Sequence, residues 1–216
     1  MCSMTWLYDA HIHLSDAEYE HDIPLILNCM KRLCIKACCV SMDYTSSKKT
    51  LELGKQSDFI LPFIGVHPEK AQDGVESTFK LIDENNETIS GIGEIGLDTT
   101  YTNSDEEFQK QEEVFKTQLS YAEKFGKPVS IHSRKTLDQI LEILPSYKIP
   151  SVLLHWFDGS KKQLQQAMDL DCYVSFGPVM VYSKDKQVLL SKVNKDKILV
   201  ETDGPVRFSR CFENKT

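Results

Sequence analysis

The chain has 216 residues, of which 41% are hydrophobic and 26% are charged, and its formal net charge at pH 7 is −7. This composition is ordinary for a globular protein and allows one large domain or two small ones. The acidic balance disfavours a protein that wraps duplex DNA through a basic face. It leaves a nucleic-acid substrate open, because bound cations can supply local positive charge.

Short apolar runs typical of strands alternate along the chain with helix-like segments. The runs lie at residues 5–13, 35–43, 59–68, 89–98, 127–134, 150–159, 171–178 and 197–205. The helix-like segments lie at residues 23–34, 46–56, 75–86, 105–125, 135–144, 160–170 and 184–193. Short continuous apolar runs are typical of strands that are buried on both faces of a parallel sheet.

This alternation of eight strands and seven helices predicts an α/β fold. No two runs are joined by a tight hairpin signal and no Gly/Ser/Pro-rich linker divides the chain, so we expect one domain over residues 1–216. Eight strands favour a closed (β/α)8 barrel of the TIM type with the helices outside. The alternative is an open doubly wound sheet, which usually carries a glycine-rich phosphate loop after its first strand, where this chain carries histidines.

The segment after the last run, residues 206–216, shows no amphipathic helix. A full barrel needs an eighth helix to cover the outside of its last strand. We therefore expect a barrel that is C-terminally short and lacks its last outer helix. The outer face of the eighth strand is then exposed or covered by a neighbouring chain, which allows self-association through that face.

The first run ends in "DAHIH", where two histidines stand two residues apart. In a strand His11 and His13 project to the same face, and Asp9 lies on that face as well. Two adjacent imidazoles can chelate a divalent metal, and a nearby carboxylate can orient one of them or join it. The alternative is a pair of unrelated histidines at an exposed strand end.

Most of the remaining histidines also follow predicted strands. His67 ends the third, His132 the fifth and His155 the sixth, whereas His21 lies in an acidic stretch and is interpreted as a solvated surface residue. Acidic and basic side chains stand at the same strand ends, namely Asp43, Glu94, Asp98, Arg134, Glu201 and Asp203. A closed barrel brings all these ends to one rim, so we predict a metal site there. The number of donors exceeds what one tetrahedral ion needs and fits two ions that share a bridging carboxylate.

Six motifs occur in a fixed order from Asp9 to Pro205: "DAHIH", "GVHP", "GEIGLD", "KPVSIHSR", "HWFDGS" and "ETDGP". Together they resemble the TatD-type deoxyribonuclease family of metal-dependent hydrolases, within the amidohydrolase-like barrels. The resemblance implies a two-metal hydrolase with DNA as its substrate. The chain departs from the family at its C-terminus, because family members continue past the last motif with a loop and a final helix.

The resemblance also implies roles for individual residues. Glu94 would bridge two divalent ions, which could be zinc, magnesium or manganese. One ion would be held by His11, His13 and Asp203, and the other by His132 and His155. Asp203 would also be the general base toward the attacking water. His67 and Arg134 would face the substrate phosphate, for which a guanidinium offers a bidentate fork.

Other polar residues near these motifs are not expected to be metal ligands. Asp98 is expected to be structural or to support a ligand, Glu201 to be structural, and Asp158 to be a turn or helix-cap residue. Asp43 is either a pocket residue or a surface group. Trp156 either lines the pocket, where it could stack on a base, or packs in the core.

The leading hypothesis is a metal-dependent deoxyribonuclease that removes nucleotides from the 3′ end of DNA. A second hypothesis is hydrolysis of a small carbonyl substrate, such as an amide or lactone, at the same rim. A third is a binding protein without catalytic activity that kept the barrel. The residues alone support only a two-metal hydrolase, and the DNA substrate is implied by the resemblance.

The seven cysteines form no C-x-x-C pair, and most lie in apolar runs. Such cysteines behave as small buried hydrophobes and are typical of a reducing compartment. The N-terminus shows no signal-peptide pattern, and no apolar run approaches the roughly 20 residues that span a bilayer. We therefore expect a cytoplasmic protein with no membrane partner.

Overall fold

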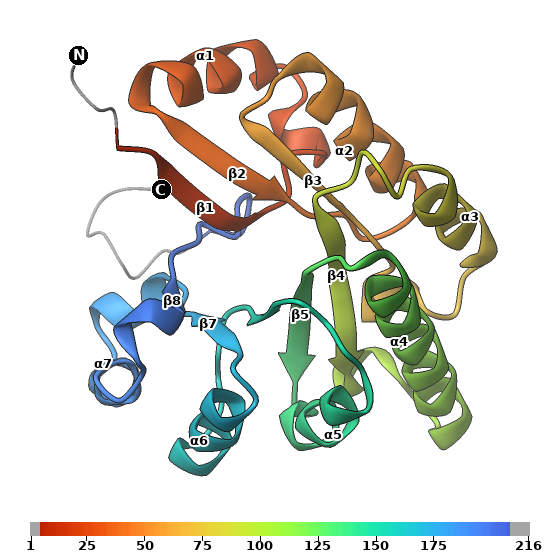
Figure 1. The fold of residues 1–216 in the computed structure, drawn as a ribbon, viewed down its shortest axis with the longest axis vertical. Coiled ribbons are helices and arrows are strands. Elements are labelled where there is room, and N and C mark those ends of the chain that lie inside the picture. The colour runs from red at the N-terminus through yellow and green to blue at the C-terminus, as the bar shows by residue number, and fades with distance from the viewer. Residues whose placement is uncertain (1–4, 208–216) are drawn as a thin grey trace.

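The computed structural model describes residues 5–207. Strands and helices alternate through this range (Figure 1). The strands are β1 (Leu7–Ile12), β2 (Ile35–Cys39), β3 (Ile60–Ile64), β4 (Gly91–Asp98), β5 (Val129–Arg134), β6 (Val152–Leu154), β7 (Tyr173–Ser175) and β8 (Ile198–Leu199). The α-helices are α1 (Ile23–Leu33), α2 (Tyr44–Gln56), α3 (Glu76–Glu84), α4 (Asp105–Phe125), α5 (Leu137–Ile143), α6 (Lys161–Asp169) and α7 (Lys184–Leu190).

All eight strands belong to one sheet in the order β1 to β8, and every neighbouring pair is parallel. Backbone hydrogen bonds then join β1 and the loop after it to the segment after β8. The Ala10 N–H donates to the Val200 carbonyl at 2.9 Å, and the Asp203 N–H donates to the His11 carbonyl at 2.9 Å. The structure is therefore the predicted (β/α)8 barrel, and the open-sheet alternative is wrong.

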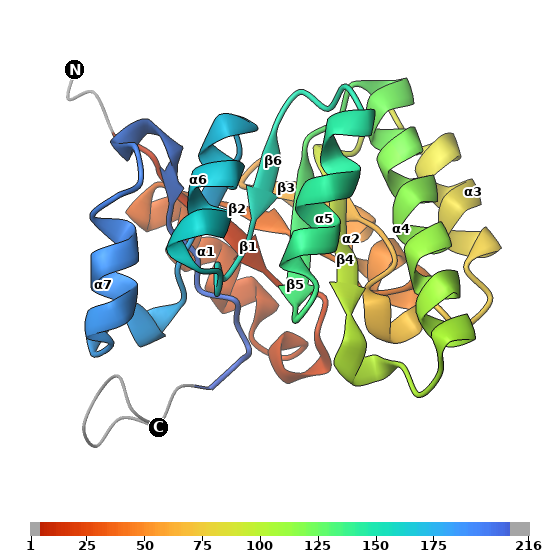
Figure 2. The same ribbon diagram turned by 90° about the horizontal axis from the view of Figure 1, so that it is seen from below.

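The helices lie outside the ring of strands, from α1 round to α7 (Figures 1 and 2). The larger hydrophobic core fills the barrel and the layer between the later strands and helices, and Phe115, Leu119 and Ile131 are among its fully buried members. A second core cluster includes residues of α1, β2 and β3. No helix within residues 5–207 is long and apolar enough to cross a membrane.

Helix boundaries follow the capping chemistry of the sequence. The 105–125 helix begins after Ser104, whose hydroxyl accepts a hydrogen bond from the Glu107 N–H at 3.2 Å, and it ends at Gly126 with φ of 60°. Such a left-handed residue suits glycine, which has no Cβ to clash. The second helix begins at Tyr44, two residues before the predicted start, because Asp43 is its N-cap and accepts from the Ser46 N–H at 2.8 Å.

The last strands are much shorter than the apolar runs that predicted them, and β8 has two residues. The remainder of each run is the loop that carries the motif residues. No helix follows β8 up to Arg207, and the side chains of Leu7, Tyr8 and Val200 are 60%, 50% and 69% exposed. Both residues of β8 are themselves half-buried, so the exposure of its outer face, like the covering of that face by a neighbouring chain, stays a prediction.

Two buried glutamines of α4 fix the ends of β3 and β4. The Gln118 amide oxygen accepts from the Val66 N–H at 2.7 Å, and its amide nitrogen donates to the Val66 carbonyl at 3.0 Å. Gln111 accepts from the Asp98 N–H at 2.8 Å and donates to the Pro68 carbonyl at 3.2 Å. Val66 and Pro68 flank His67, so α4 positions the backbone of a predicted site residue.

Replacing Gln118 by leucine should lower the free energy of unfolding by about 2–4 kcal/mol, because both polar groups of Val66 lose their partner inside the protein. Urea denaturation followed by circular dichroism measures this. The matched control is Gln109→Leu on the exposed side of the same helix, for which we expect a change of less than about 0.5 kcal/mol. Equal losses in the two variants would contradict the role of Gln118.

Candidate metal centre

The C-terminal ends of the strands bring all six predicted ligands to one rim of the barrel, as strand-end placement predicts. His11 lies on β1 and is completely buried, Glu94 lies on β4 and His132 on β5. The loops after β1, β6 and β8 carry the remaining three, which are His13, His155 and Asp203. A cavity of about 520 Å³ opens over this rim, and Arg134 and His67 line it as well.

Three side-chain atoms at one side of the rim, from His11, His13 and Glu94, lie close enough together to hold one ion. The Nε2 atoms of His11 and His13 are 3.3 Å apart, and they lie 3.5 Å and 3.2 Å from Glu94 Oε2. Both nitrogens lie 3.5 Å from Asp203 Oδ1. Donor atoms 3.2–3.5 Å apart can share one ion, because zinc binds nitrogen and oxygen at about 2.0–2.2 Å. The donor set therefore fits a divalent metal ion.

The other carboxylate oxygen of Glu94 faces a second group of imidazoles. Glu94 Oε1 lies 2.9 Å from His132 Nδ1 and 2.8 Å from His155 Nε2. One carboxylate thus presents a different oxygen to each of two donor groups. This is the arrangement in which a carboxylate can bridge two ions.

Hydrogen bonds on the far side of two rings leave the inner nitrogen available as a ligand. His11 Nδ1 is 2.8 Å from the Ser130 hydroxyl, and His132 Nε2 is 2.9 Å from Asp98 Oδ2. A proton held between each of these pairs puts the lone pair of the neutral ring on the nitrogen that faces Glu94. His155 Nδ1 is buried without a hydrogen-bond partner, 3.8 Å from Glu201 Oε2.

His67 differs from the other rim histidines in its hydrogen bonding. Its Nδ1 accepts from the Glu69 N–H at 3.1 Å, and burial lowers its pKa to about 3, so the ring is neutral. The proton must then be on Nε2, which lies 3.7 Å from Glu94 Oε1. This nitrogen can donate a hydrogen bond into the cavity and cannot ligate a metal in that tautomer.

The carboxylates of the centre set the charge of two histidines. Burial opposes the charged ring of His13, but the carboxylates of Asp203 and Glu94 outweigh it and raise the pKa of His13 to about 10. The same balance, with Asp98 and Glu94, raises the pKa of His132 to about 9. Burial also disfavours the charged form of Glu94, but His155, His67 and His11 hold the pKa of this carboxyl well below its usual range.

Close packing of β4 against β5 beside the ligands depends on Gly96. Its φ is +149°, and a Cβ at this position would overlap the carbonyl oxygen of His132. No other residue adopts this conformation readily. The glycine in "GEIGLD" therefore lets Glu94 and His132 approach each other.

Two further acidic residues, Asp9 and Glu201, accept hydrogen bonds from the backbone. Asp9 was expected to orient a histidine ring, but its carboxylate accepts from the His11 N–H at 3.2 Å and from the Thr202 N–H at 3.1 Å, which ties β1 to the last motif. Glu201 accepts from the Trp156 N–H at 2.9 Å and from the Ser175 hydroxyl at 2.5 Å. The structural interpretation of Glu201 agrees with these contacts.

The remaining acidic residues lie at the edges of the site. Asp43 caps α2, as described above. It also lines a smaller cavity beside the one of about 520 Å³ over the predicted ligands, which we call the metal-lined cavity. Asp158 forms an ion pair with Lys186, and the N-cap of α6 is Ser160, so the interpretation of Asp158 as a helix cap is wrong. Trp156 lines the metal-lined cavity, in agreement with the first of its two interpretations.

Ser130 is the residue of the site that the sequence interpretation missed. It stands two residues before His132 on the same strand, so both project to the same face of β5. This i, i+2 relation within "SIH" was the available signal. Its partner, His11, is 119 residues away in the chain, and only the closed barrel brings the two together.

Comparison with known proteins gives one consistent result. The sequence model of the family described as TatD related DNase matches residues 8–211. The chain is 29% identical to the "uncharacterized metal-dependent hydrolase YabD" of Bacillus subtilis, in a match that covers 97% of this chain and 84% of the relative. It is 27% identical to the human "deoxyribonuclease TATDN3", with 92% of this chain and 78% of the relative covered.

Solved structures show the same barrel. The Escherichia coli protein YJJV, a TatD homolog, superposes with a TM-score of 0.82 at 22% identity, over 91% of this chain and 78% of that one. A TatD family hydrolase from Entamoeba histolytica superposes with a TM-score of 0.78 at 21% identity, over 93% and 75% of the two chains. These similarities support the fold.

Proposed function

This chain belongs to the TatD related DNase family of metal-dependent hydrolases, and from that premise we propose that it is a deoxyribonuclease that hydrolyses phosphodiester bonds at a two-ion centre. The observation that carries this proposal is the position of Glu94, whose Oε2 lies within 3.5 Å of the His11 and His13 donors and whose Oε1 lies within 2.9 Å of the His132 and His155 donors. The names of the human and mouse TATDN3 relatives, which include deoxyribonuclease, support DNA as the substrate.

In this proposal Glu94 bridges two divalent ions. His11, His13 and Asp203 would hold one of them together with Glu94, and His132 and His155 would hold the other. The nitrogen donors of the first group suit zinc, and manganese or magnesium are the alternatives. When bound, the ions would neutralise the phosphate and lower the pKa of the attacking water.

The side chains around the ions would accept the proton of the water and bind the phosphate. Asp203 takes the proton of the attacking water, because its carboxylate stands at the centre and opens onto the same cavity. Arg134 is exposed at the end of β5 and binds the phosphate through its guanidinium. The Nε2–H of His67 donates a second hydrogen bond to an oxygen of the same phosphate.

We further propose that cleavage proceeds from the 3′ end of DNA, and that residues 1–216 form one catalytic domain. The proposed compartment is the cytoplasm. The free thiols of Cys29, Cys38, Cys39 and Cys172 support a reducing environment.

The experiment is digestion of single-stranded and duplex DNA that is labelled at the 5′ end in one set and at the 3′ end in the other. Metal-stripped protein receives magnesium, manganese or zinc. We expect metal-dependent loss of nucleotides, with immediate release of a 3′ label and a ladder from a 5′ label. Metal-loaded protein that hydrolyses lactones or amides but leaves DNA and bis(p-nitrophenyl) phosphate intact would overturn the proposal.

Metal binding should strengthen as the pH rises from 7 to 9. His13 and His132, with pKa values of about 10 and 9, are protonated at pH 7 in the metal-free protein, and each must lose its proton to become a ligand. The apparent affinity for zinc should therefore rise by about tenfold per pH unit for each proton displaced. Titration against a chromophoric chelator, corrected for the pH dependence of the chelator, measures this.

A matched variant is Asp98→Asn, which removes the carboxylate partner of His132 Nε2. This change should lower the pKa of His132 and reduce the number of protons released by the second ion only. Calorimetric titration in buffers of different ionisation enthalpy counts those protons. A zinc affinity that is independent of pH in the wild type would contradict the assignment of His13 and His132 as ligands.

A further inference from the structure

Two smaller cavities flank the metal-lined cavity on opposite sides of the barrel. A cavity of about 440 Å³ lies beyond β5 and β6 and shares Ser133, Arg134 and Asp158 with the metal-lined cavity. Beyond β1 and β2, an inner cavity of about 220 Å³ shares His13, Asp16 and Met42 with the metal-lined cavity. It leads to an outer cavity of about 370 Å³. We call the side with the cavity of about 440 Å³ the β5 flank, and the side with the other two cavities the β1 flank.

The β5 flank presents uncompensated positive charge. Arg134 and Lys135 are exposed there, and no carboxylate lies within 4 Å of either cation among residues 5–207. Its two carboxylates are already engaged, since Asp158 pairs with Lys186 and Asp138 accepts from the Gln163 amide at 2.9 Å. Lys135 also has a φ of 61°, a left-handed conformation that costs free energy for a residue with a side chain and is enriched at ligand-binding sites.

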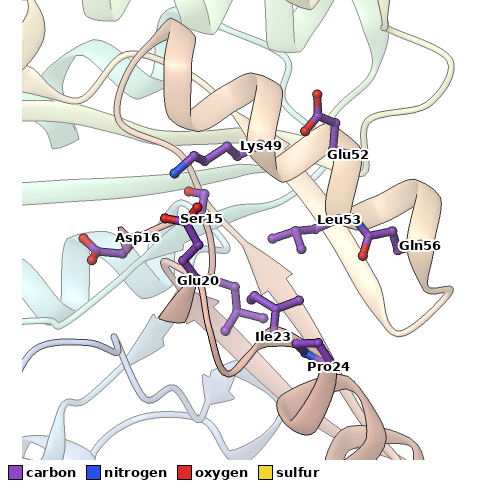
Figure 3. Close-up of a pocket in the computed structure, with 10 residues that line it drawn as sticks. Ser15, Asp16, Glu20, Ile23, Pro24, Lys49, Glu52, Leu53 and Gln56 are labelled. Atoms are coloured by element: carbon purple, nitrogen blue, oxygen red, sulfur yellow. The ribbon is translucent and has the colours of Figure 1, made fainter. Parts of the chain in front are cut away.

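The β1 flank has the opposite character. Figure 3 shows its outer cavity, where Asp16, Glu20 and Glu52 surround a single labelled cation, Lys49, over a floor that includes Leu53. In the inner cavity, Lys70 lies 3.2 Å from Glu69, which offsets its charge. A strand of phosphates would meet net repulsion on this side.

We propose that the DNA strand retained by the enzyme leaves the metal centre across the β5 flank, and that Lys135 is a positioning residue for the phosphate next to the scissile one. This inference rests on the proposed deoxyribonuclease function. Each nucleotide carries one negative charge, so the uncompensated pair on the β5 flank attracts the strand and the carboxylates of the β1 flank repel it. The asymmetry gives the strand one path away from the ions.

The test compares Lys135→Gln with Lys49→Gln, a matched lysine-to-glutamine change on the opposite flank. The substrates are a twelve-nucleotide single strand and the p-nitrophenyl ester of thymidine 5′-phosphate, which contains only the scissile phosphate. For Lys135→Gln we expect the KM of the oligonucleotide to rise about fivefold with kcat unchanged, and the KM of the ester to stay as in the wild type. The slope of log KM against log salt should fall by roughly 0.7, the value for one contact to a single strand. Lys49→Gln should change none of these.

Each other outcome decides against the proposal. An effect of Lys49→Gln equal to or larger than that of Lys135→Gln would place the strand on the β1 flank, and an unchanged KM and salt slope in Lys135→Gln would remove the role of Lys135. If the wild type cleaves no oligonucleotide, the proposed function fails separately. Fluorescence anisotropy of the labelled oligonucleotide then still tests Lys135, and an affinity that is the same in wild type and variant overturns its role.

Discussion

Replacing Glu94 by glutamine should leave the protein unable to hold either ion firmly and should lower its activity by about a thousandfold or more. Glu94 is buried, with 3% of its surface exposed, and both of its oxygens face histidine donors. Glutamine keeps the shape but removes the negative charge and turns one ligand oxygen into a hydrogen-bond donor. One substitution therefore removes the ligand oxygen of one donor group and replaces that of the other by a weaker, neutral one.

The measurement is metal content by mass spectrometry after dialysis, together with kcat/KM on the thymidine ester. The matched control is Glu201→Gln, a second buried glutamate of the rim, whose oxygens accept from the Trp156 N–H and the Ser175 hydroxyl. This variant should keep both ions. A Glu94→Gln protein that still holds two ions would refute the bridging role, and loss of an ion from Glu201→Gln alone would place a ligand group around Glu201 instead.

The gathering of the proposed ligands at one rim could be predicted from the sequence because it follows from two simple rules. Side chains two apart in a strand share a face, which paired His11 with His13, and parallel strands of a barrel end at one rim, which gathered the others. Neither rule needs side-chain distances. For the same reason the helix ranges agreed closely with the structure, since the spacing of apolar residues and the capping residues are local properties.

The contacts that orient these ligands could not be predicted, because they join residues that are distant in the chain. His11 meets Ser130 across 119 positions, and Asp9 meets Thr202 across 193. Strand alternation placed Asp9 on the face of the histidines, but the closure of the barrel gave its carboxylate to backbone N–H groups instead. The division of the two Glu94 oxygens likewise depends on the lateral positions of β1, β5 and β6.

The protonation of His67 illustrates the same limit at the level of one ring. Its position after a strand resembles that of the metal ligands His132 and His155 in the proposal. What separates it from them is the hydrogen bond from the Glu69 N–H to Nδ1, which belongs to the turn that follows the strand. The sequence shows the proline after His67 but not this hydrogen bond, so the tautomer of the ring could not be predicted.

The last prediction separates the two proposed roles of Asp203. In Asp203→Asn, the amide oxygen can still take the position of Oδ1, 3.5 Å from the His11 and His13 nitrogens. It cannot take a proton. We therefore expect weaker metal binding that an excess of zinc restores, and a kcat that stays about a hundred- to a thousandfold below wild type at saturating metal.

The matched comparison is His13→Asn, which weakens the same group of metal donors without removing a base. Its kcat should recover with added metal to within about tenfold of wild type, while that of Asp203→Asn should not. Titration of both variants with zinc, followed by kcat on the thymidine ester, gives the contrast directly. Full recovery of Asp203→Asn would show that Asp203 acts as a ligand alone, because a general base cannot be replaced by more metal, and another group at the rim would then have to accept the proton.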